Sequence, residues 1–490
     1  MLTRRQFLKT AGSAAMASAC ATAARTERGV VLNDIHSRLN ATEVARVVRP
    51  ARADDLATIV RDAQREGAAV SVMGGRHAMG GQQFGVGAIA VDTTEMGRVL
   101  GFDSERGLVT VEAGIQWPAL IGHLVRVQAG RPRPWGIVQK QTGADRLSIG
   151  GAIAANVHGR GLRLPPFVGD LEAFTLVDPA GEVRRCSRAE NPDLFRLVVG
   201  GYGLFGIVAT ATLRLAPRRK LERVVEVIDM EALAERFDQR IAEGFVFGDC
   251  QYATDPASDA FLRRGVFSCY RPVDDGGAVP DVQNELSLDD WNRLLYLSHA
   301  DKGRAFELYA GYYLSTNGQL YWSDTHQLSV YVDDYHAGLD RQLGATVPAT
   351  EVITEVYADR RELGRFLADA RRVLRQQNAN VIYGTVRLIE RDTETFLAWA
   401  KDRYACVIFN LHTEHSPEGR ARAADQFRAL IDVALAHGGS YFLTYHRHAT
   451  RAQIDAAYPQ LGEFLRLKRR WDPDERFQSD WYRHYRAMFA

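Results

Sequence analysis

The sequence predicts an α+β fold in which a two-lobed domain is covered by a second domain of antiparallel strands and helices. One observation is length, because 490 residues exceed what a single hydrophobic core usually holds. Another is the stretch from about residue 40 to 217, where short strands alternate with helices and Gly-rich turns. The third is a change after the basic run 218–220, beyond which the predicted elements are longer.

The domain predicted at 40–217 opens with a helix over 50–67, in which the apolar residues of one helical face are Leu56, Ile59, Val60 and Ala63. Strand patterns follow at 68–73 and 88–92. The pattern then predicts a hairpin of strands 99–103 and 108–112 and a helix over 117–128.

The domain predicted at 218–437 consists of longer elements. Its clearest members are a strand at 350–357, a helix at 360–377, a strand at 381–389, a helix near 393–403 and a strand at 406–412. The segment 438–490 is predicted to hold one strand, a helix and a Trp/Tyr-rich end, and to return to the first domain. No internal repeat is evident.

The N-terminus is typical of a twin-arginine export signal, predicted over residues 1–26. Arg4 and Arg5 precede an Ala-rich run, and no acidic residue occurs before Glu27. This route exports folded proteins, often with a cofactor already bound, so we expect a periplasmic or other extracytoplasmic location. The residues up to Cys20 also resemble a lipoprotein processing site that lacks its usual large apolar residue, so a lipid anchor at Cys20 stays an alternative.

Composition excludes several other classes of function. The formal net charge is +1 and no basic stripe occurs, so no nucleic-acid partner is expected. No apolar run approaches ~18 residues, so no membrane span is predicted after processing. The five cysteines are widely spaced and show no metal-ligand pattern, which favours isolated buried thiols over a disulfide and predicts no metal site.

A glycine-rich loop at residues 72–81 (VMGGRHAMGG) is the strongest local signal for a ligand. Its glycines allow the backbone to approach a ligand closely and its amide N–H groups to converge on a phosphate. The loop follows a predicted strand, but no long helix follows it, so it does not fit the dinucleotide GxGxxG arrangement. Taken alone, such a loop is more often a simple turn.

Four further motifs follow the loop along the sequence, and together with it they indicate a ligand site. These are QTG at 141–143, LSIGGAIAANVHG at 147–159, NPDLF at 191–195 and GGYGLFGIV at 200–208. The ordered set resembles the vanillyl-alcohol-oxidase-type flavoproteins with an FAD-binding domain of PCMH type. The resemblance covers roughly residues 45–217 and returns from about 438 to 484. It implies an extended FAD in the first domain, with the second domain as a cap over the flavin ring.

The resemblance also implies which residues meet FAD. The pyrophosphate would lie on the loop amides, further residues would line the flavin, and the backbone of Ile207 would meet the ring edge. The implied set is Gly74, Gly75, Arg76, His77, Ala78, Gly80, Gly143, Ser148, Ile149, Gly150, Gly151, Ala155, Asn156, Val157, His158, Ile207 and Phe442.

His77 has two interpretations. It is either a loop histidine that satisfies local backbone groups or the point of a covalent link to FAD. Alditol, aldonolactone and cytokinin oxidases carry a histidine in this loop, and a neutral imidazole is a competent nucleophile. The C-terminal tail, however, resembles decaprenylphosphoryl-ribose oxidase, whose flavin is not tethered. Ala144 stands near where doubly linked relatives carry a cysteine, so we expect one link at most.

Three residues are candidates for the chemistry. Arg387 lies on an otherwise apolar strand, in a place similar to a substrate-contacting arginine of alditol oxidase. His412 alternates with Asn410 on the next strand and could accept a proton. Tyr445 stands where the tail of the ribose oxidase family has its catalytic lysine. For each residue a structural role is the alternative: an internal ion pair, a half-buried histidine and a core aromatic ring.

The predicted function is an exported FAD-dependent oxidoreductase that acts on a CH–OH donor. The expected substrate is a small polyol, sugar or aldonolactone, with hydride transfer to flavin N5 and with oxygen or another electron acceptor as oxidant. Amine oxidation is a second hypothesis, because the N-terminal half resembles cytokinin dehydrogenase. A flavin-binding sensor or electron carrier without turnover is a third.

Overall fold

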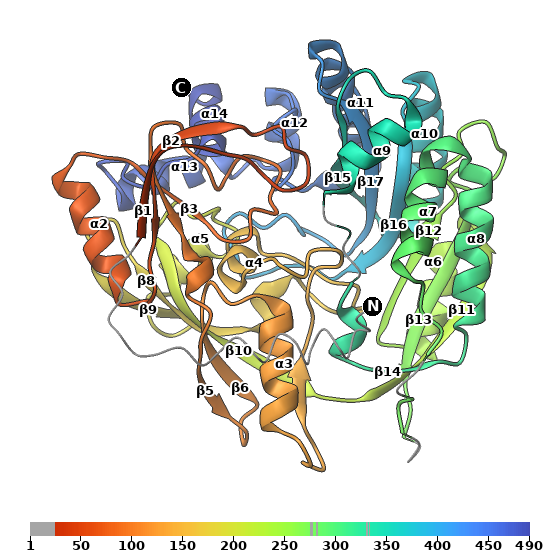
Figure 1. Ribbon diagram of the computed structural model, residues 1–490, viewed down its shortest axis with the longest axis horizontal. Coiled ribbons are helices and arrows are strands. Elements are labelled where there is room, and N and C mark those ends of the chain that lie inside the picture. Colours follow the sequence, from red (N-terminus) through yellow and green to blue (C-terminus); the bar gives the residue numbers. More distant parts are fainter. Residues whose placement is uncertain (1–24, 275–277, 281–282, 330–331, 333) are drawn as a thin grey trace.

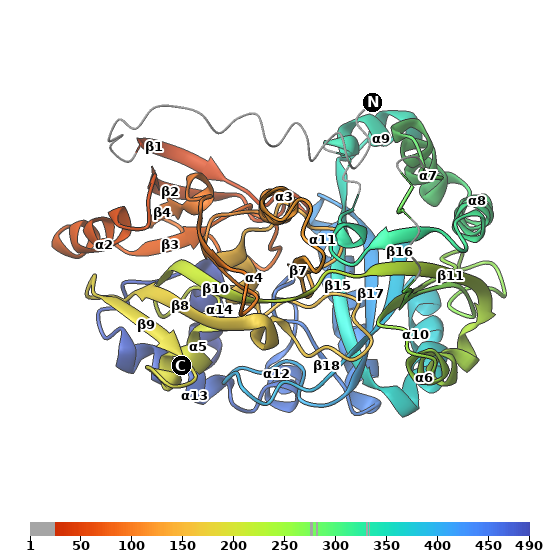
Figure 2. The ribbon, with the colours of Figure 1, turned by 90° about the horizontal axis from the view of Figure 1, so that it is seen from below.

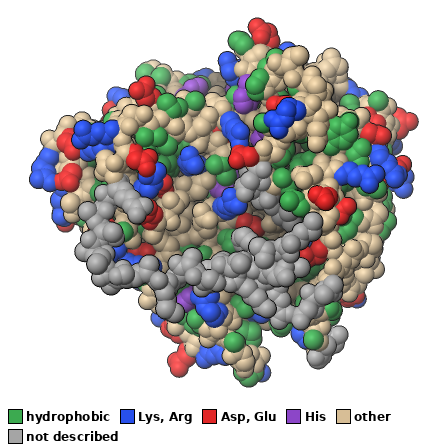
Figure 3. Space-filling model, viewed as in Figure 1, with side chains coloured by type: hydrophobic (Ala, Val, Ile, Leu, Met, Phe, Trp, Pro, Cys, Tyr) green, Lys and Arg blue, Asp and Glu red, His purple; other side chains and the backbone are tan. Residues whose placement is uncertain are grey.

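A computed structural model describes residues 25–274, 278–280, 283–329, 332 and 334–490. The arginine pair and Cys20 lie outside the described residues. Figure 1 shows two halves side by side, with most elements before residue 217 on the left and the later strands on the right. None of the described helices is long and apolar enough to cross a bilayer. On the face in Figure 3, basic and acidic side chains are interspersed over both halves.

A four-stranded sheet in the order β1-β2-β4-β3 carries the glycine loop. β1 and β2 are antiparallel, whereas β4 runs parallel to both β2 and β3. Helix α2 connects β2 to β3 and buries Leu56, Val60 and Ala63 against the sheet, the same face that the sequence pattern predicts. The bounds are β1 (Arg25–Leu32), β2 (Thr42–Arg49), α2 (Asp55–Arg65), β3 (Val70–Met73) and β4 (Ile89–Asp92).

A second, antiparallel sheet follows in the order β5-β6-β10-β8-β9, with β7 paired to the end of β10. The predicted hairpin at 99–103 and 108–112 is confirmed as β5 and β6. The bounds are β5 (Val99–Asp103), β6 (Leu108–Glu112), α3 (Trp117–Val127), β7 (Trp135–Ile137), α4 (Ile149–Ala155), β8 (Leu171–Val177), β9 (Val183–Ser187), α5 (Pro192–Val198) and β10 (Ile207–Pro217), with short helices η1 (Thr93–Glu95) and η2 (Phe167–Asp170).

The right half is an eight-stranded antiparallel sheet in the order β14-β11-β13-β12-β16-β17-β15-β18. Figure 2 shows α7, α8 and α9 on one side of this sheet and α6 and α10 on the other. The bounds are β11 (Lys220–Asp229), α6 (Leu233–Ala242), β12 (Phe247–Tyr252), β13 (Arg264–Pro272), α7 (Leu288–Ala300), α8 (Lys302–Ser315), β14 (Leu320–Trp322), η4 (Thr325–Gln327), α9 (Tyr335–Leu343), β15 (Ala349–Asp359), α10 (Leu363–Gln376), β16 (Val381–Ile389), β17 (Tyr404–Glu414), α11 (Pro417–Ala436) and β18 (Ser440–Tyr441).

This sheet contains one structural unit twice, although no internal repeat is evident in the sequence. β11 leads through η3 (Met230–Ala232) and α6 to β12 and β13, and β15 leads through η5 (Arg360–Glu362) and α10 to β16 and β17. In each unit an aspartate, Asp229 or Asp359, accepts a hydrogen bond from the backbone N–H two residues later and caps the short helix. The two units share their topology and this helix cap, but not an extended stretch of similar sequence.

The tail crosses back to the left half. After β18 it forms α12 (Arg451–Ala457), α13 (Leu461–Trp471) and α14 (Asp480–Met488), where the sequence analysis expected one helix. Pro459 and Pro473 separate these helices, because the residue before a proline is disfavoured in helical conformation. Phe477 bridges Val70 of β3, and its neighbours hydrogen-bond the same residue, so the tail extends the first sheet.

Another prediction was wrong: residues 393–403 form a loop, not a helix. Asp392 accepts hydrogen bonds from the backbone N–H groups of Glu394 and Thr395, a turn that competes with helix formation. Isolated thiols are confirmed for the four cysteines of the described chain, which are buried and form no disulfide: Cys186, Cys250, Cys269 and Cys406.

Candidate active site

A cavity of about 390 Å³ lies between the two halves of the molecule. This volume is in the range of cofactor and small-molecule sites, roughly 300–1,000 Å³. Its wall comes from the glycine loop and segments 141–158 and 198–208 on one side, and from β15, β16, β17 and residues 442–445 on the other. The site is therefore assembled from segments more than 300 residues apart.

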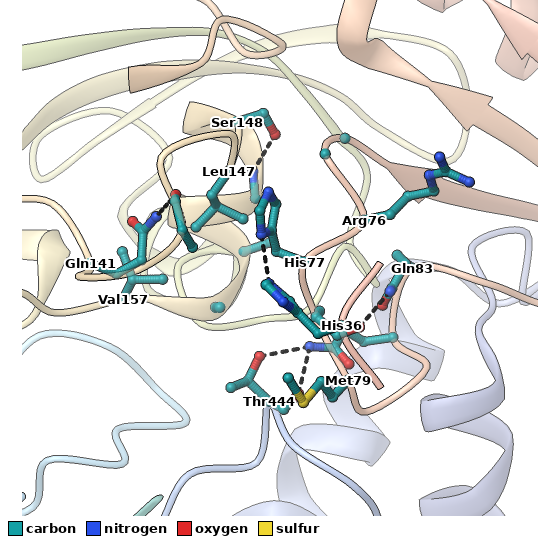
Figure 4. Close-up of a pocket in the computed structure, with 18 of the residues that line it drawn as sticks. His36, Arg76, His77, Met79, Gln83, Gln141, Leu147, Ser148, Val157 and Thr444 are labelled. Atoms are coloured by element: carbon teal, nitrogen blue, oxygen red, sulfur yellow. Dashed lines mark hydrogen bonds between the residues drawn. The ribbon is translucent and has the colours of Figure 1, made fainter. Parts of the chain in front are cut away.

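The glycine loop forms one wall with its backbone. A Cβ atom on Gly74 would lie 2.2 Å from Ser148 Oγ, and one on Gly75 would lie 2.2 Å from the carbonyl oxygen of Arg146. Only glycine fits at these two positions, so the loop backbone comes directly against the segment that opens α4. Ser148 Oγ caps that helix by accepting from the Gly151 N–H at 3.2 Å (Figure 4).

The cavity suits an extended flavin nucleotide in its chemistry. Backbone and glycines line the loop end, where phosphate oxygens need amide donors. Apolar side chains line the middle, as an aromatic ring system requires, among them Val72, Ala113, Val157, Val198, Leu204 and Val208. Charged and polar side chains gather at the β15–β16–β17 end. The residues present therefore fit FAD.

The structure brings most of the predicted FAD residues to this cavity. Those that line it are Gly74, Gly75, Arg76, His77, Ala78, Gly143, Ser148, Gly150, Gly151, Ala155, Val157, His158 and Phe442. Four of the predicted residues are not among its lining: Gly80, Ile149, Asn156 and Ile207. Ile149 and Ile207 are buried in hydrophobic cores. Gly206 and Val208, the two neighbours of Ile207, line the cavity in its place.

Asn156 and Gly80 have contacts that explain their positions. Asn156 is fully buried, donates to Asp392 Oδ2 at 2.9 Å and accepts from the Val168 N–H at 2.9 Å, so it fixes the loop that replaces the predicted 393–403 helix. A Cβ atom on Gly80 would lie 2.6 Å from the carbonyl oxygen of Tyr445, so Gly80 allows the tail to approach the glycine loop.

His77 contacts a histidine that the sequence analysis did not identify. Figure 4 shows His36 and His77 pointing toward one another, and His36 Nε2 lies 2.8 Å from His77 Nδ1. Burial lowers the pKa of His36 to about 4 and holds the pKa of His77 well below its ordinary value. Both imidazoles are therefore neutral at neutral pH.

Arg387 and Tyr445 both reach the polar end of the cavity. Arg387 is 5% exposed, and within the described residues it forms no ion pair and its Nε has no hydrogen-bond partner. The internal ion pair considered as its alternative role is thus missing from the described part of the chain. A buried guanidinium nitrogen without a hydrogen-bond partner is costly, so Arg387 is suited to bind an oxygen atom of a ligand.

Glu355 is the central acidic group at this end, and the sequence analysis missed it. Its Oε2 accepts from the Tyr445 hydroxyl at 3.3 Å, and its Oε1 accepts from His158 Nε2 at 2.7 Å and from the Tyr357 hydroxyl. Burial opposes ionisation, but His158, Tyr357 and Arg387 outweigh it and hold the pKa of Glu355 below its ordinary value. Glu355 is therefore a buried, ionised carboxylate that lines the cavity.

Tyr445 differs from Glu355 in its protonation. Burial, reinforced by the negative charge of Glu355, raises the pKa of Tyr445 well above its ordinary value. The phenol is therefore neutral at any ordinary pH and acts as a hydrogen-bond donor. Glu351, Ile353 and Glu355 are alternate residues of strand β15 and share one face of it. The two glutamates on this face are the sequence signal that could have revealed this end of the cavity.

His412 lies next to the cavity rather than in its lining. Its Nδ1 is 3.4 Å from Glu351 Oε1, and Glu351 also contacts His299, His336 and the Tyr335 hydroxyl. Burial opposes ionisation of Glu351, but its contacts with the three histidines hold its pKa well below the ordinary value. His412 thus belongs to a separate polar cluster beside the polar end of the cavity.

Comparison with known proteins agrees with this geometry. Residues 44–187 match the family model of an FAD binding domain, and residues 353–485 match that of D-arabinono-1,4-lactone oxidase. The L-gulono-1,4-lactone dehydrogenase of Mycobacterium tuberculosis is 26% identical over 440 residues, which cover 89% of this chain and 95% of that protein.

Two plant enzymes match over shorter segments. The mitochondrial L-galactono-1,4-lactone dehydrogenase 1 of Oryza sativa subsp. japonica is 36% identical over 132 residues, 27% of this chain and 21% of that protein. Cytokinin dehydrogenase 2 of the same plant is 29% identical over 209 residues, 40% of this chain and 35% of that protein. The chain thus combines an FAD-binding domain of PCMH type with a lactone-oxidase-type C-terminal region, and it is an FAD-dependent oxidoreductase that acts on a CH–OH donor.

Proposed function

We propose that this protein oxidises a hydroxyl-bearing carbon of an aldono-1,4-lactone or a closely related sugar or polyol. The observation that carries the proposal is that Arg387 and Glu355, both buried, face one cavity from the region matched by the lactone oxidase model. Relatives named as lactone dehydrogenases support the substrate class, and the L-gulono-1,4-lactone enzyme matches almost end to end. The cytokinin dehydrogenase match covers less than half of this chain, so amine oxidation has weaker support.

FAD, when bound, supplies the two-electron acceptor for the hydrogen on the substrate carbon. The protein then has to take the hydroxyl proton and stabilise the charge that develops on the substrate oxygen. Glu355 is the only one of Glu355, Tyr445 and Arg387 that is ready to accept a proton, since it is ionised and the phenol of Tyr445 is neutral. Tyr445 donates a hydrogen bond to this carboxylate and positions it.

Arg387 has the complementary role. Its guanidinium is a positive charge at the polar end of a partly enclosed cavity, where an electrostatic interaction is stronger than in water. A lactone presents several hydroxyl groups and a carbonyl oxygen, and each can accept from the guanidinium. Arg387 therefore binds a substrate oxygen and stabilises its developing negative charge.

The test is anaerobic reduction of the purified yellow protein. L-Gulono-, L-galactono- and D-arabinono-1,4-lactone, a set of polyols and a set of amines are added separately, and the loss of flavin absorbance is followed. Bleaching by at least one lactone or polyol, and by no amine, is the expected result. Bleaching by amines alone would contradict the proposal, and no bleaching by any compound would favour a flavin-binding protein without turnover.

Two further parts of the proposal concern the cofactor and the location. The neutral His77 ring on the cavity wall, hydrogen-bonded to His36, supports a single covalent link between FAD and His77. The arginine pair at the N-terminus supports export of the folded protein by the twin-arginine route. Both are tested by substitutions described in the Discussion.

A further inference from the structure

Four side chains from four separate elements meet beside the substrate end of the cavity. They are His299 of α7, His336 of α9, Glu351 of β15 and His412 of β17, and we call them the histidine–glutamate cluster. Glu351 is its centre, because all three histidines contact its carboxylate. The active-site chemistry derived above uses none of the four residues.

Three atoms of this cluster have the spacing of metal ligands. His299 Nε2 lies 3.2 Å and His412 Nδ1 lies 3.4 Å from Glu351 Oε1, and the three ligand atoms all lie within 4.8 Å of one another. A tetrahedral site with bonds of about 2.0–2.1 Å has ligand-to-ligand edges of about 3.3–3.4 Å. Hydrogen bonds between an ionised carboxylate and a cationic N–H donor are usually shorter, about 2.7–2.9 Å.

The other oxygen of Glu351 is held separately. Oε2 lies 2.9 Å from His336 Nδ1 and accepts a hydrogen bond from the Tyr335 hydroxyl. The carboxylate is thereby turned so that Oε1 faces His299 and His412. Contacts that orient a ligand from its far side are typical of the surroundings of metal sites.

The burial and the contacts of these side chains also indicate a metal site. The His299 side chain is 3% exposed, and in the described part of the structure its Nε2 has no hydrogen-bond partner of acceptable direction. Glu351 is 6% exposed, and Lys302 donates to the carbonyl oxygens of Ser298 and Val381 rather than to this carboxylate. A buried carboxylate beside an imidazole nitrogen that lacks a well-directed hydrogen bond is a site that a divalent cation would complete.

We propose that His299, His412 and Glu351 bind one divalent transition-metal ion of the Zn²⁺ class, with His336 and Tyr335 orienting the carboxylate. Two imidazoles and one carboxylate are a ligand set found in zinc sites that keep a fourth position open. Glu351 and His336 also line the cavity, so the open position faces the substrate end. The ion is then a Lewis acid that takes an oxygen of the substrate as its fourth ligand; this last step rests on the proposed function.

The first test is elemental analysis of the holoenzyme. Wild-type protein and variants are dialysed against micromolar Zn²⁺, desalted, and assayed for zinc and FAD in the same sample. Wild type should hold about one zinc per FAD. His412→Ala and Glu351→Gln should lose at least ten-fold in zinc at unchanged FAD. His437→Ala is the matched control, because His437 also contacts two carboxylates, those of Asp369 and Glu362, and none of these residues belongs to the cluster; this variant should keep its zinc.

Less than 0.1 zinc per FAD in wild type, or wild-type zinc in both cluster variants, would overturn the site. If a variant loses FAD, the site is tested on the wild-type protein alone. Co²⁺ bound at the same site should give a visible ligand-field band at longer wavelength than the flavin, and absence of this band would contradict the site. The substrate role predicts that chelator-treated, FAD-loaded enzyme has a KM for L-gulono-1,4-lactone raised at least ten-fold, and an unchanged KM overturns that role. If no lactone reduces the flavin, the proposed function fails while the zinc content still reports on the site.

Discussion

The hydroxyl group of Tyr445 donates a hydrogen bond to Oε2 of Glu355 over 3.3 Å, and this contact joins the C-terminal tail to strand β15 at the edge of the cavity. Tyr445 was a sequence candidate for proton transfer, and Glu355 was not. Because the carboxylate is ionised and the phenol is neutral, we propose that Glu355 accepts the substrate proton and that Tyr445 positions it.

Removal of the Tyr445 hydroxyl is the first prediction. Tyr445→Phe should keep the fold and the flavin, since the ring still packs against Phe442. Flavin reduction should slow by roughly 10²-fold, because Glu355 loses the donor that orients it. A core aromatic would behave differently: its loss of one buried hydrogen bond costs about 1 kcal/mol of stability and leaves the rate alone. Stopped-flow reduction and thermal melting of the same sample separate the two outcomes.

Glu355→Gln should have the larger kinetic effect. The amide keeps the shape but cannot accept the substrate proton, so reduction should fall by roughly 10²–10⁴-fold. The wild-type rate should be level between about pH 6 and 8 and fall only in acid, because the pKa of Glu355 is lowered. A folded-state pKa below the unfolded one means that the carboxylate stabilises the protein above the unfolded pKa, and that this stability is lost as the pH falls through the folded value. A rate that falls already near neutrality would argue for a different base.

Arg387→Met should separate function from stability. The substitution removes a buried charge that forms no ion pair in the described structure and whose Nε has no hydrogen-bond partner, so the melting temperature should change little or rise. Flavin reduction by substrate should fall by roughly 10²–10³-fold. Arg223→Met is the matched control, because buried Arg223 donates to the Tyr270 hydroxyl and to Thr316 Oγ1, and its loss should lower the melting temperature. Equal destabilisation by both changes would make Arg387 a structural residue.

Export is tested with Arg4→Lys combined with Arg5→Lys. The twin-arginine machinery reads this pair, so the double variant should accumulate as a cytoplasmic precursor that still contains FAD. Cell fractionation with an antibody to the protein measures the distribution. Unchanged export would indicate the general secretory route and would remove the argument for folding before transport.

The sequence predicted those parts of the fold that depend on local pattern. The hairpin of β5 and β6 and the helix α10 follow from alternation and helical spacing within their own residues. The prediction of a helix at 393–403 failed because Asp392 is held by Asn156, which lies 236 residues away in the chain. Glu355 shares a strand face with Glu351, which is a local signal, but its role as a held carboxylate depends on the distant residues Tyr445 and His158. The histidine–glutamate cluster draws one residue from each of four elements, so no spacing in the sequence could have indicated it.

The link between His77 and FAD is the last prediction. If the link exists, acid-precipitated wild-type protein should stay yellow, and His77→Ala should release all of its FAD into the supernatant. His36→Ala provides a graded test, because His36 holds His77 Nδ1 at 2.8 Å and both rings are neutral through burial. Without this partner the His77 ring loses its fixed orientation, so the covalently bound fraction should fall while FAD binding persists. Colour that leaves the unmutated protein on precipitation would contradict the link and would leave FAD binding by the glycine loop intact.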